Sequence, residues 1–272
     1  MLRQRVTVAL ILLPIGVFAI MAGEGWFAAV IGLILGLAAY EYVQLFQAGG
    51  WQPAGFLVVA GAVALVVARY LDGFTHDTWL IPTLVLLSMG AHVIAYERGR
   101  EQAATDFGTT LGGIFYIGLL GSFLIPLRAL PDGEWWILVV LPAVWLADSG
   151  AYFIGGKYGN HKMTPRLSPN KSWEGYFGGI VFSVIGTALL VQIYYQLGLE
   201  PTSQITPSRA VIIGILMSVI PTLGDLGESM IKRQMGKKDS GTILPGHGGM
   251  FDRIDSWLWA AVIGYFAIVW LF

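Results

Sequence analysis

Residues 222–256 read TLGDLGESMIKRQMGKKDSGTILPGHGGMFDRIDS and gather acids, bases, glycines and one histidine in a chain that is otherwise mostly apolar. Hydrophobic residues make up 56% of the 272 residues, and charged residues only 12%. Soluble domains carry about 25% charged residues. The composition therefore predicts an all-α polytopic integral membrane protein that holds this polar stretch at one membrane face.

Apolar runs long enough to cross the bilayer recur along the whole chain, since about 20 helical residues cross about 30 Å of hydrocarbon. They lie at about 6–22, 26–46, 54–71, 78–96, 108–130, 135–154, 175–197, 209–231 and 253–272. The gap between the first two, Gly23 to Gly25, is so short that a re-entrant pair is the alternative to two spans. We expect about nine transmembrane helices.

The basic residues predict the orientation of these helices, because short cytoplasmic loops are enriched in lysine and arginine. With the N-terminus inside, nine spans place 13 of the 16 basic residues on one side. These are Arg3, Arg5, Arg98, Arg100, Lys157, Lys162, Arg166, Lys171, Lys232, Arg233, Lys237, Lys238 and Arg253. The pattern predicts a cytoplasmic N-terminus and two basic cytoplasmic loops, 155–174 and 232–252.

Five acids lie near the same ends of three predicted helices. Asp148 is near the end of the sixth, Asp225 and Glu228 near the end of the eighth, and Asp252 and Asp255 at the start of the ninth. The i, i+3 spacing places each pair on one helical face. Ionisable groups within a span cost about 2.5 to 3.5 kcal/mol, so they are expected to face a protein interior or a wet cavity. We expect an active site at the cytoplasmic ends of helices 6, 8 and 9.

The mixture of acids, bases and glycines indicates chemistry on phosphates. Neighbouring carboxylates repel one another unless a cation lies between them, and Mg²⁺ is commonly held by one or two carboxylates together with substrate phosphates. Flanking lysines and arginines suit phosphate oxygens. The glycines of residues 245–249 let backbone N–H groups approach an anion just before a helix N-terminus. Metal-assisted phosphoryl or nucleotidyl transfer is the reaction class that this set predicts.

Three blocks of the chain resemble the phosphatidate cytidylyltransferase family, also called CDP-diacylglycerol synthases. The strongest block is Ser229 to Asp255, with the ordered elements SMIKR, KKDSG and PGHGGMFDRID. Two further blocks are DSGAYFIGGK from Asp148 and SPNKSWEG from Ser168. The resemblance is strong over the C-terminal half, whereas the N-terminal half resembles generic membrane helices. It implies an N-terminal scaffold, residues 1–130, and a C-terminal catalytic region, residues 131–272.

The resemblance implies transfer of a cytidylyl group from CTP to phosphatidic acid, which gives CDP-diacylglycerol and pyrophosphate. It implies a requirement for Mg²⁺, with room for a second cation such as K⁺. It also implies a homodimer in the lipid of the bacterial inner membrane, with the active site facing the cytoplasm.

Roles for individual residues follow from the same resemblance. Asp225 and Asp252 are expected to bind the metal, and Asp255 to share in catalysis. Asp148 and Glu228 would support these ligands or hold a second cation. His247 is either a structural loop residue or a proton donor to a leaving phosphate.

Seven polar residues are expected to bind the phosphates of CTP or of the lipid. They are Ser168, Lys171, Ser172, Lys232, Arg233, Lys237 and Lys238. The alternative for the basic loop is an anchor that contacts anionic lipid headgroups. Glu41, late in the second span, is expected to have a structural role.

Two other functions compete with cytidylyl transfer. A CTP-dependent polyprenol or lipid kinase would use a similar set of acids and bases. An ion-coupled transporter would bind its cation with intramembrane acids, but those acids lie near the bilayer midplane. The net charge of −1 gives no basic field that would indicate a nucleic-acid partner.

Overall fold

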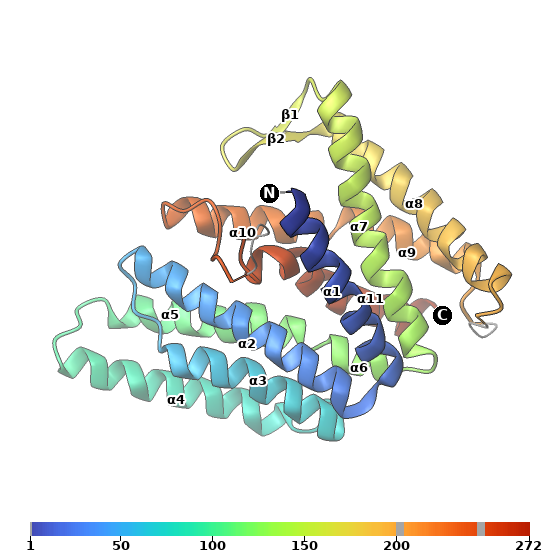
Figure 1. Cartoon of the computed structure of the whole chain (residues 1–272). Coiled ribbons are helices and arrows are strands. Elements are labelled where there is room, and N and C mark those ends of the chain that lie inside the picture. The colour runs from blue at the N-terminus through green and yellow to red at the C-terminus, as the bar shows by residue number, and fades with distance from the viewer. Residues whose placement is uncertain (1, 200–203, 244–247) are drawn as a thin grey trace. The chain divides into compact units, whose positions relative to one another are not determined.

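Helices make up most of the computed structural model, which describes residues 2–199, 204–243 and 248–272 (Figure 1). Those residues form eleven α-helices, one π-helical segment and two short β-strands. Eight helical segments in the described part of the chain are long and apolar enough to cross a membrane. The chain is therefore a mostly helical polytopic membrane protein, as its composition predicts.

The eight segments correspond to eight of the nine apolar runs. They are Gly25–Ala48, Gly55–Asp72, Asp77–Glu97, Ala103–Ala129, Gly133–Tyr158, Trp173–Gln196, Pro207–Gln234 and Phe251–Leu271. The remaining run falls in helix α1 (Leu2–Ala22), whose described apolar part, Leu12–Ala22, is shorter. Gly23, with a φ of 66° that favours glycine, separates α1 from α2 (Glu24–Ala48). The count of nine spans and the cytoplasmic orientation stay predictions.

The helices pack as two compact units. One comprises Met1–Pro126 and Ile231–Ile254, and the other comprises Leu127–Met230 and Asp255–Phe272. Helices α6 (Leu124–Ala129), α10 (Thr222–Gln234) and α11 (Phe251–Leu271) contribute residues to both units. The division predicted at residue 130 concerns which half carries the chemistry, and it stays a prediction.

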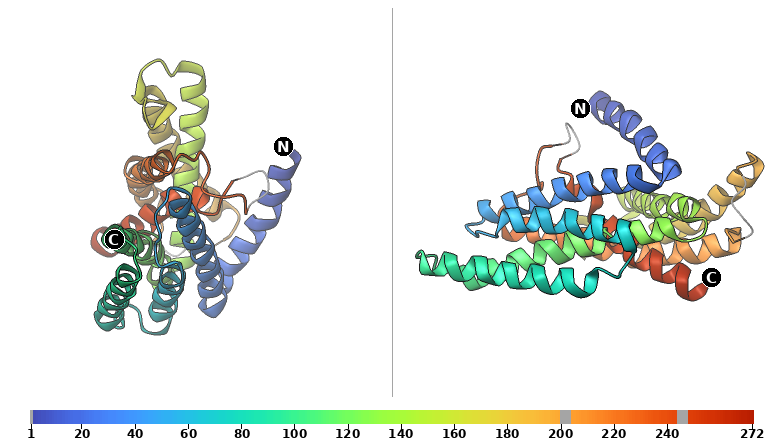
Figure 2. Two further views of the ribbon diagram at one scale, coloured as in Figure 1. Left: turned by 90° about the vertical axis from the view of Figure 1, so that its left-hand side faces the viewer. Right: turned by 90° about the horizontal axis from the view of Figure 1, so that it is seen from below.

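The first unit is a bundle in which α2 to α5 run alongside one another (Figures 1 and 2). After α2 come α3 (Gly55–Asp72), α4 (Asp77–Glu97), α5 (Ala103–Gly113) and the π-helical segment η1 (Ile114–Leu119). The contact among α3, α4 and η1 is apolar, with Leu65, Ala68, Leu80, Leu84 and Ile114 buried together in one cluster. Van der Waals packing of such side chains holds helices side by side in a membrane protein.

Arg69, one of the three basic residues expected on the non-cytoplasmic side, is buried in the first unit. Its guanidinium pairs with Asp77 at 3.0 Å, donates to the Leu119 carbonyl at 3.0 Å, and lies 4.8 and 4.3 Å from the ring centroids of Phe74 and Phe123. Buried charges need such partners. This arginine therefore stabilises a helix junction.

The second unit begins with a helical hairpin. Helix α7 (Gly133–Tyr158) packs against α8 (Trp173–Gln196), and α9 (Pro207–Val219) packs on both (Figure 1). The Ser183 hydroxyl, buried on α8, lies 2.8 Å from the Ala143 carbonyl on α7 and 3.2 Å from the Gly214 carbonyl on α9. Side-chain to backbone bonds of this kind tie membrane helices together.

The loop predicted at 155–174 is shorter than expected and contains a β-hairpin. Helix α7 continues to Tyr158, and α8 begins at Trp173. Between them, β1 (Lys162–Thr164) and β2 (Ser168–Ser172) pair antiparallel. The expectation of an all-α chain missed this hairpin because its strands are too short and polar to show an apolar alternation.

The connection between α2 and α3 is tied to the start of α5. Asp106, which is fully buried, accepts from the Gln52 amide at 2.8 Å and pairs with Arg100 at 2.6 Å. The hydrogen bond to Asp106 raises the pKa of Arg100. Two loops of the first unit are therefore held by one carboxylate.

Replacing Asp106 with alanine leaves the Gln52 amide without its acceptor and removes the carboxylate that pairs with the Arg100 guanidinium. We predict a loss of about 3 kcal/mol, which lowers the melting temperature in detergent by roughly 5 to 10 °C. The matched control is Glu101→Ala, an exposed acid in the same loop, which should melt like the wild type. Equal melting temperatures for the two variants would contradict this role of Asp106.

Candidate active site

A break between α9 and α10 brings an acid to the start of a new helix. Helix α9 ends at Val219 and α10 begins at Thr222, with Pro221 between them. Proline disfavours helical geometry in the residue before it and supplies no N–H of its own. Asp225 consequently lies in the first turn of α10, where the partial positive charge of the helix end stabilises a carboxylate.

Three of the five predicted acids come together in the second unit. Asp225, Glu228 and Asp255 each offer a carboxylate oxygen, and these oxygens lie within 4.8 Å of one another. Glu228 is 1% exposed, whereas Asp225 and Asp255 are half-buried. Asp225 and Glu228 come from one face of α10, as their spacing predicts, and Asp255 comes from α11. We call these three residues the acidic group.

Lys171 is the basic partner of the acidic group. Its Nζ lies 2.5 Å from Oδ2 of Asp225, and the Ser229 hydroxyl donates to Oδ1 of the same carboxylate at 3.3 Å. Lys171 comes from β2, so the hairpin delivers this charge to α10. Ionised carboxylates at such close range repel one another, and Lys171 places a positive charge beside one of the three.

A close approach of α10 to α11 makes this grouping possible. A Cβ atom on Gly224 would lie 2.5 Å from the backbone oxygen of Asp255 and 2.7 Å from Cδ1 of Trp259. Real Cβ atoms do not come so close to backbone, so the position accepts only glycine without a shift of the helices. Gly224 thus sets the spacing between the helices that carry the acids.

Asp252 is held within the first unit by four contacts. Its Oδ1 pairs with Lys232 at 2.6 Å, and its Oδ2 accepts from the Ser240 amide at 2.9 Å and the Gly249 amide at 2.8 Å. The Ser240 hydroxyl donates to the same Oδ2 at 2.9 Å. The side chain is 8% exposed. Its predicted role as a metal ligand is not tested by these contacts and stays a prediction.

The remaining predicted residues differ in accessibility. Arg233, Lys237 and Lys238 are exposed, and Asp148 is an exposed residue of α7. Ser168 is half-buried in β2. Ser172 is buried, and its hydroxyl accepts from the Gly175 amide at 3.2 Å as the N-cap of α8. His247 lies outside the described residues, and its role stays a prediction.

Two residues that the sequence did not place at the site lie beside Asp252. Ser240 contributes both its amide and its hydroxyl, and Glu41 contacts the Ser240 hydroxyl at 3.2 Å. The signature block contained Ser240 but gave it no role. The only sequence signal for Glu41 was an acidic residue late in an apolar run, and the structure shows that it is buried.

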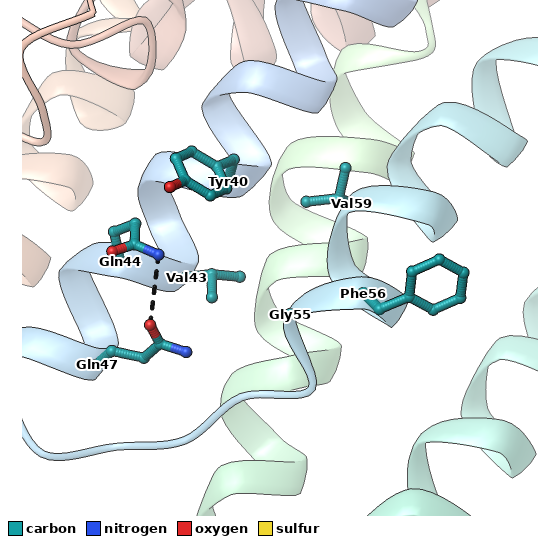
Figure 3. A pocket seen from close by; sticks show the side chains of 7 residues that line it. All are labelled: Tyr40, Val43, Gln44, Gln47, Gly55, Phe56 and Val59. Carbon is teal, nitrogen blue, oxygen red and sulfur yellow. Dashed lines mark hydrogen bonds between the residues drawn. The ribbon is translucent and has the colours of Figure 1, made fainter.

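A groove of about 320 Å³ lies between α2 and the start of α3 (Figure 3). It is lined by Tyr40, Val43, Gln44, Gln47, Gly55, Phe56 and Val59. The predicted acids and bases are not among these residues, and its walls are mostly apolar. The residues predicted to carry the chemistry therefore do not line this groove.

Comparisons with known proteins cover nearly the whole chain. A family model described as "Cytidylyltransferase family" matches residues 3–271. The chain is 38% identical to a phosphatidate cytidylyltransferase of Pseudomonas aeruginosa, over 99% of this chain and 97% of that protein. It is 31% identical to one of Synechocystis, over 98% and 97%, and 32% identical to one of Brucella suis, over 97% and 92%.

Replacing Gly224 with alanine should force α10 and α11 apart and disperse the acidic group. We predict a loss of about 1 to 3 kcal/mol from overpacking, together with loss of the rise in melting temperature that MgCl₂ gives the wild type. Gly156→Ala is the matched control, because a Cβ there meets open space. If Gly224→Ala keeps both the wild-type melting temperature and its response to MgCl₂, the close approach does not shape the acidic group.

Proposed function

This chain belongs to the cytidylyltransferase family, and from that membership and its acidic group we infer that it transfers the cytidylyl group of CTP to phosphatidate. The products are CDP-diacylglycerol and pyrophosphate, so the protein is a nucleotidyltransferase of phospholipid biosynthesis. The observation that carries this conclusion is 38% identity over 99% of the chain to a phosphatidate cytidylyltransferase. The resemblance of the signature blocks is thereby confirmed and extends to the N-terminal half.

The reaction joins two anions. A phosphate oxygen of phosphatidate forms a bond to the α-phosphorus of CTP, the bond from that phosphorus to the β-phosphate oxygen breaks, and pyrophosphate leaves with the electron pair. The attacking oxygen is already negative, so no strong general base is needed. The work of the protein is to screen charge, to align the attack and to stabilise the leaving group.

The acidic group has the donor chemistry for a divalent cation. Its carboxylate oxygens are the hard ligands that Mg²⁺ prefers, and their separation of at most 4.8 Å lets more than one contact a single ion. Asp225 and Asp255 are the proposed ligands, with Glu228 behind them. When bound, Mg²⁺ would draw negative charge from the phosphates of CTP. Asp252 remains a proposed further ligand, and K⁺ a proposed second cation.

The basic residues are proposed to hold phosphates. Lys171 already pairs with Asp225 of the acidic group. From that position its ammonium group can also bind a substrate phosphate. Arg233, Lys237 and Lys238 are exposed, so their charges are available to CTP or to the lipid headgroup. Lys232 pairs with Asp252, which favours a role in orienting that carboxylate. Ser168 and His247 keep their proposed contacts with phosphate.

We place the protein in the bacterial inner membrane with the site toward the cytoplasm, as a homodimer. The eight apolar helical segments of the described chain and the bacterial relatives support the membrane location. The asymmetry of basic residues supports the cytoplasmic orientation, and CTP is a cytoplasmic nucleotide. The homodimer rests on the family resemblance alone.

Labelled CTP tests the reaction and separates it from the kinase alternative. Purified protein with phosphatidate and MgCl₂ should transfer label from the α-position of CTP to lipid and release label from the γ-position as pyrophosphate. Asp225→Asn and Asp255→Asn should each lower the rate about 100-fold or more, because several kcal/mol of charge stabilisation depends on the cation.

The control variant is Asp72→Asn, an exposed acid at the end of α3, which should keep wild-type activity. Transfer of label from the γ-position to lipid would show that the protein is a kinase and would contradict the proposed reaction. Wild-type rates in Asp225→Asn and Asp255→Asn would remove the acidic group from the mechanism.

A further inference from the structure

Glu41 is a buried carboxylate of α2 that binds a loop far away in the sequence. It is 2% exposed. Its Oε2 accepts from the Phe251 amide at 2.9 Å and lies 3.2 Å from the Ser240 hydroxyl oxygen, across 210 and 199 residues of sequence. All three residues belong to the first unit. Glu41 therefore fixes Ser240 and the first residue of α11 to α2.

The Ser240 hydroxyl links Glu41 to Asp252. It lies 3.2 Å from Oε2 of Glu41 and 2.9 Å from Oδ2 of Asp252, while its own backbone amide donates to that Oδ2 at 2.9 Å. Ser240 therefore helps to orient Asp252, together with Lys232 and the Gly249 amide, and Glu41 contacts Ser240 from the other side.

The glycines of this segment fit closely around the Glu41 carboxylate. A Cβ on Gly249 would overlap the Ser240 hydroxyl and Oε2 of Glu41, and a Cβ on Gly241 would overlap Oε1 of Glu41. The sequence alone suggested that such glycines let backbone approach a phosphate. The structure gives Gly249 of that set a second task, which it shares with Gly241: both let the backbone lie against the Glu41 carboxylate.

A charge at this position is costly unless it has a specific use. An ionisable side chain in a membrane helix costs about 2.5 to 3.5 kcal/mol, and an apolar side chain would pack α2 without that cost. Phe251 begins α11, so its amide presents the partial positive end of that helix to the carboxylate. What Glu41 provides is a fixed position for Ser240 and for the N-terminal end of α11, both of which lie next to Asp252.

We propose that Glu41 is a positioning residue for cytidylyl transfer, which holds Ser240 and the Phe251 amide so that Asp252 presents a fixed carboxylate. Glu41 itself touches no substrate. The inference rests on the proposed function, because the consequence of losing this position is measured in the same reaction. It assigns a functional task to a residue that the sequence indicated only as structural.

Three variants on α2 test the proposal in the full-length protein. Glu41→Ala removes the contacts with the Phe251 amide and with Ser240, so we expect a 10- to 100-fold loss of kcat/KM and about a tenfold rise in the MgCl₂ concentration for half-maximal rate. Glu41→Gln keeps an acceptor oxygen and should stay within about fivefold of the wild type. Gln44→Ala is the control, because Gln44 is an exposed residue one turn away whose amide bonds Gln47 at 3.4 Å (Figure 3).

Amide hydrogen exchange supplies a readout that does not depend on activity. Exchange at Ser240, Gly249 and Phe251 should accelerate in Glu41→Ala and remain at the wild-type rate in Gln44→Ala. Unchanged exchange in Glu41→Ala would overturn the proposal. So would a lower yield of folded Glu41→Ala protein whose rate depends on MgCl₂ and CTP as in the wild type. An inactive wild type would instead overturn the proposed function, and the exchange data would still decide the task of Glu41.

If Glu41→Ala does not fold, a substitution in the loop that contacts Glu41 tests the proposal instead. Gly249→Ala should reproduce the rise in the MgCl₂ requirement, because its Cβ displaces Ser240 from Glu41. Gly90→Ala is the matched control, since a Cβ at Gly90 of α4 meets open space. Wild-type kinetics in Gly249→Ala would overturn the proposal.

Discussion

A carboxylate in an apolar helical protein has to be compensated by a hydrogen bond, a basic side chain or a bound cation. This constraint accounts for the contacts around the acids of this protein. Asp225 has Lys171 at 2.5 Å, and Asp252 has Lys232 at 2.6 Å. Glu41 has the Ser240 hydroxyl and a backbone amide. Each of these partners belongs to another segment of the chain, so the contacts that compensate the acids also position the loops around them.

Helix ends supply the rest of the site. The break at Pro221 starts a new helix just before Asp225, and Gly224 lets that helix lie against α11 closely enough for Asp255 to join the group. Neither device adds a charge. Together they bring three carboxylates to one place, which is where we propose that a divalent cation binds. A protein that joins two anions needs such a place more than it needs a strong base.

Much of this could be predicted from the sequence because it follows from local pattern. The apolar runs predicted eight of the described membrane helices, and the i, i+3 spacing predicted that Asp225 and Glu228 share a face. The signature block identified the family. The partner of Glu41 could not be predicted, because 199 residues separate it from Ser240 and helical periodicity does not say which loop a buried face contacts. The hairpin was missed because short polar strands leave no alternation.

The central claim is that acids from α10 and α11 hold one divalent cation between them. Mn²⁺ bound in crystals of the enzyme, and located by its anomalous scattering, tests this most directly. We predict a single strong peak about 2.0 to 2.6 Å from carboxylate oxygens of both Asp225 and Asp255. A peak that contacts the acid of one helix alone, or a map without a peak near these residues at saturating Mn²⁺, would contradict the claim.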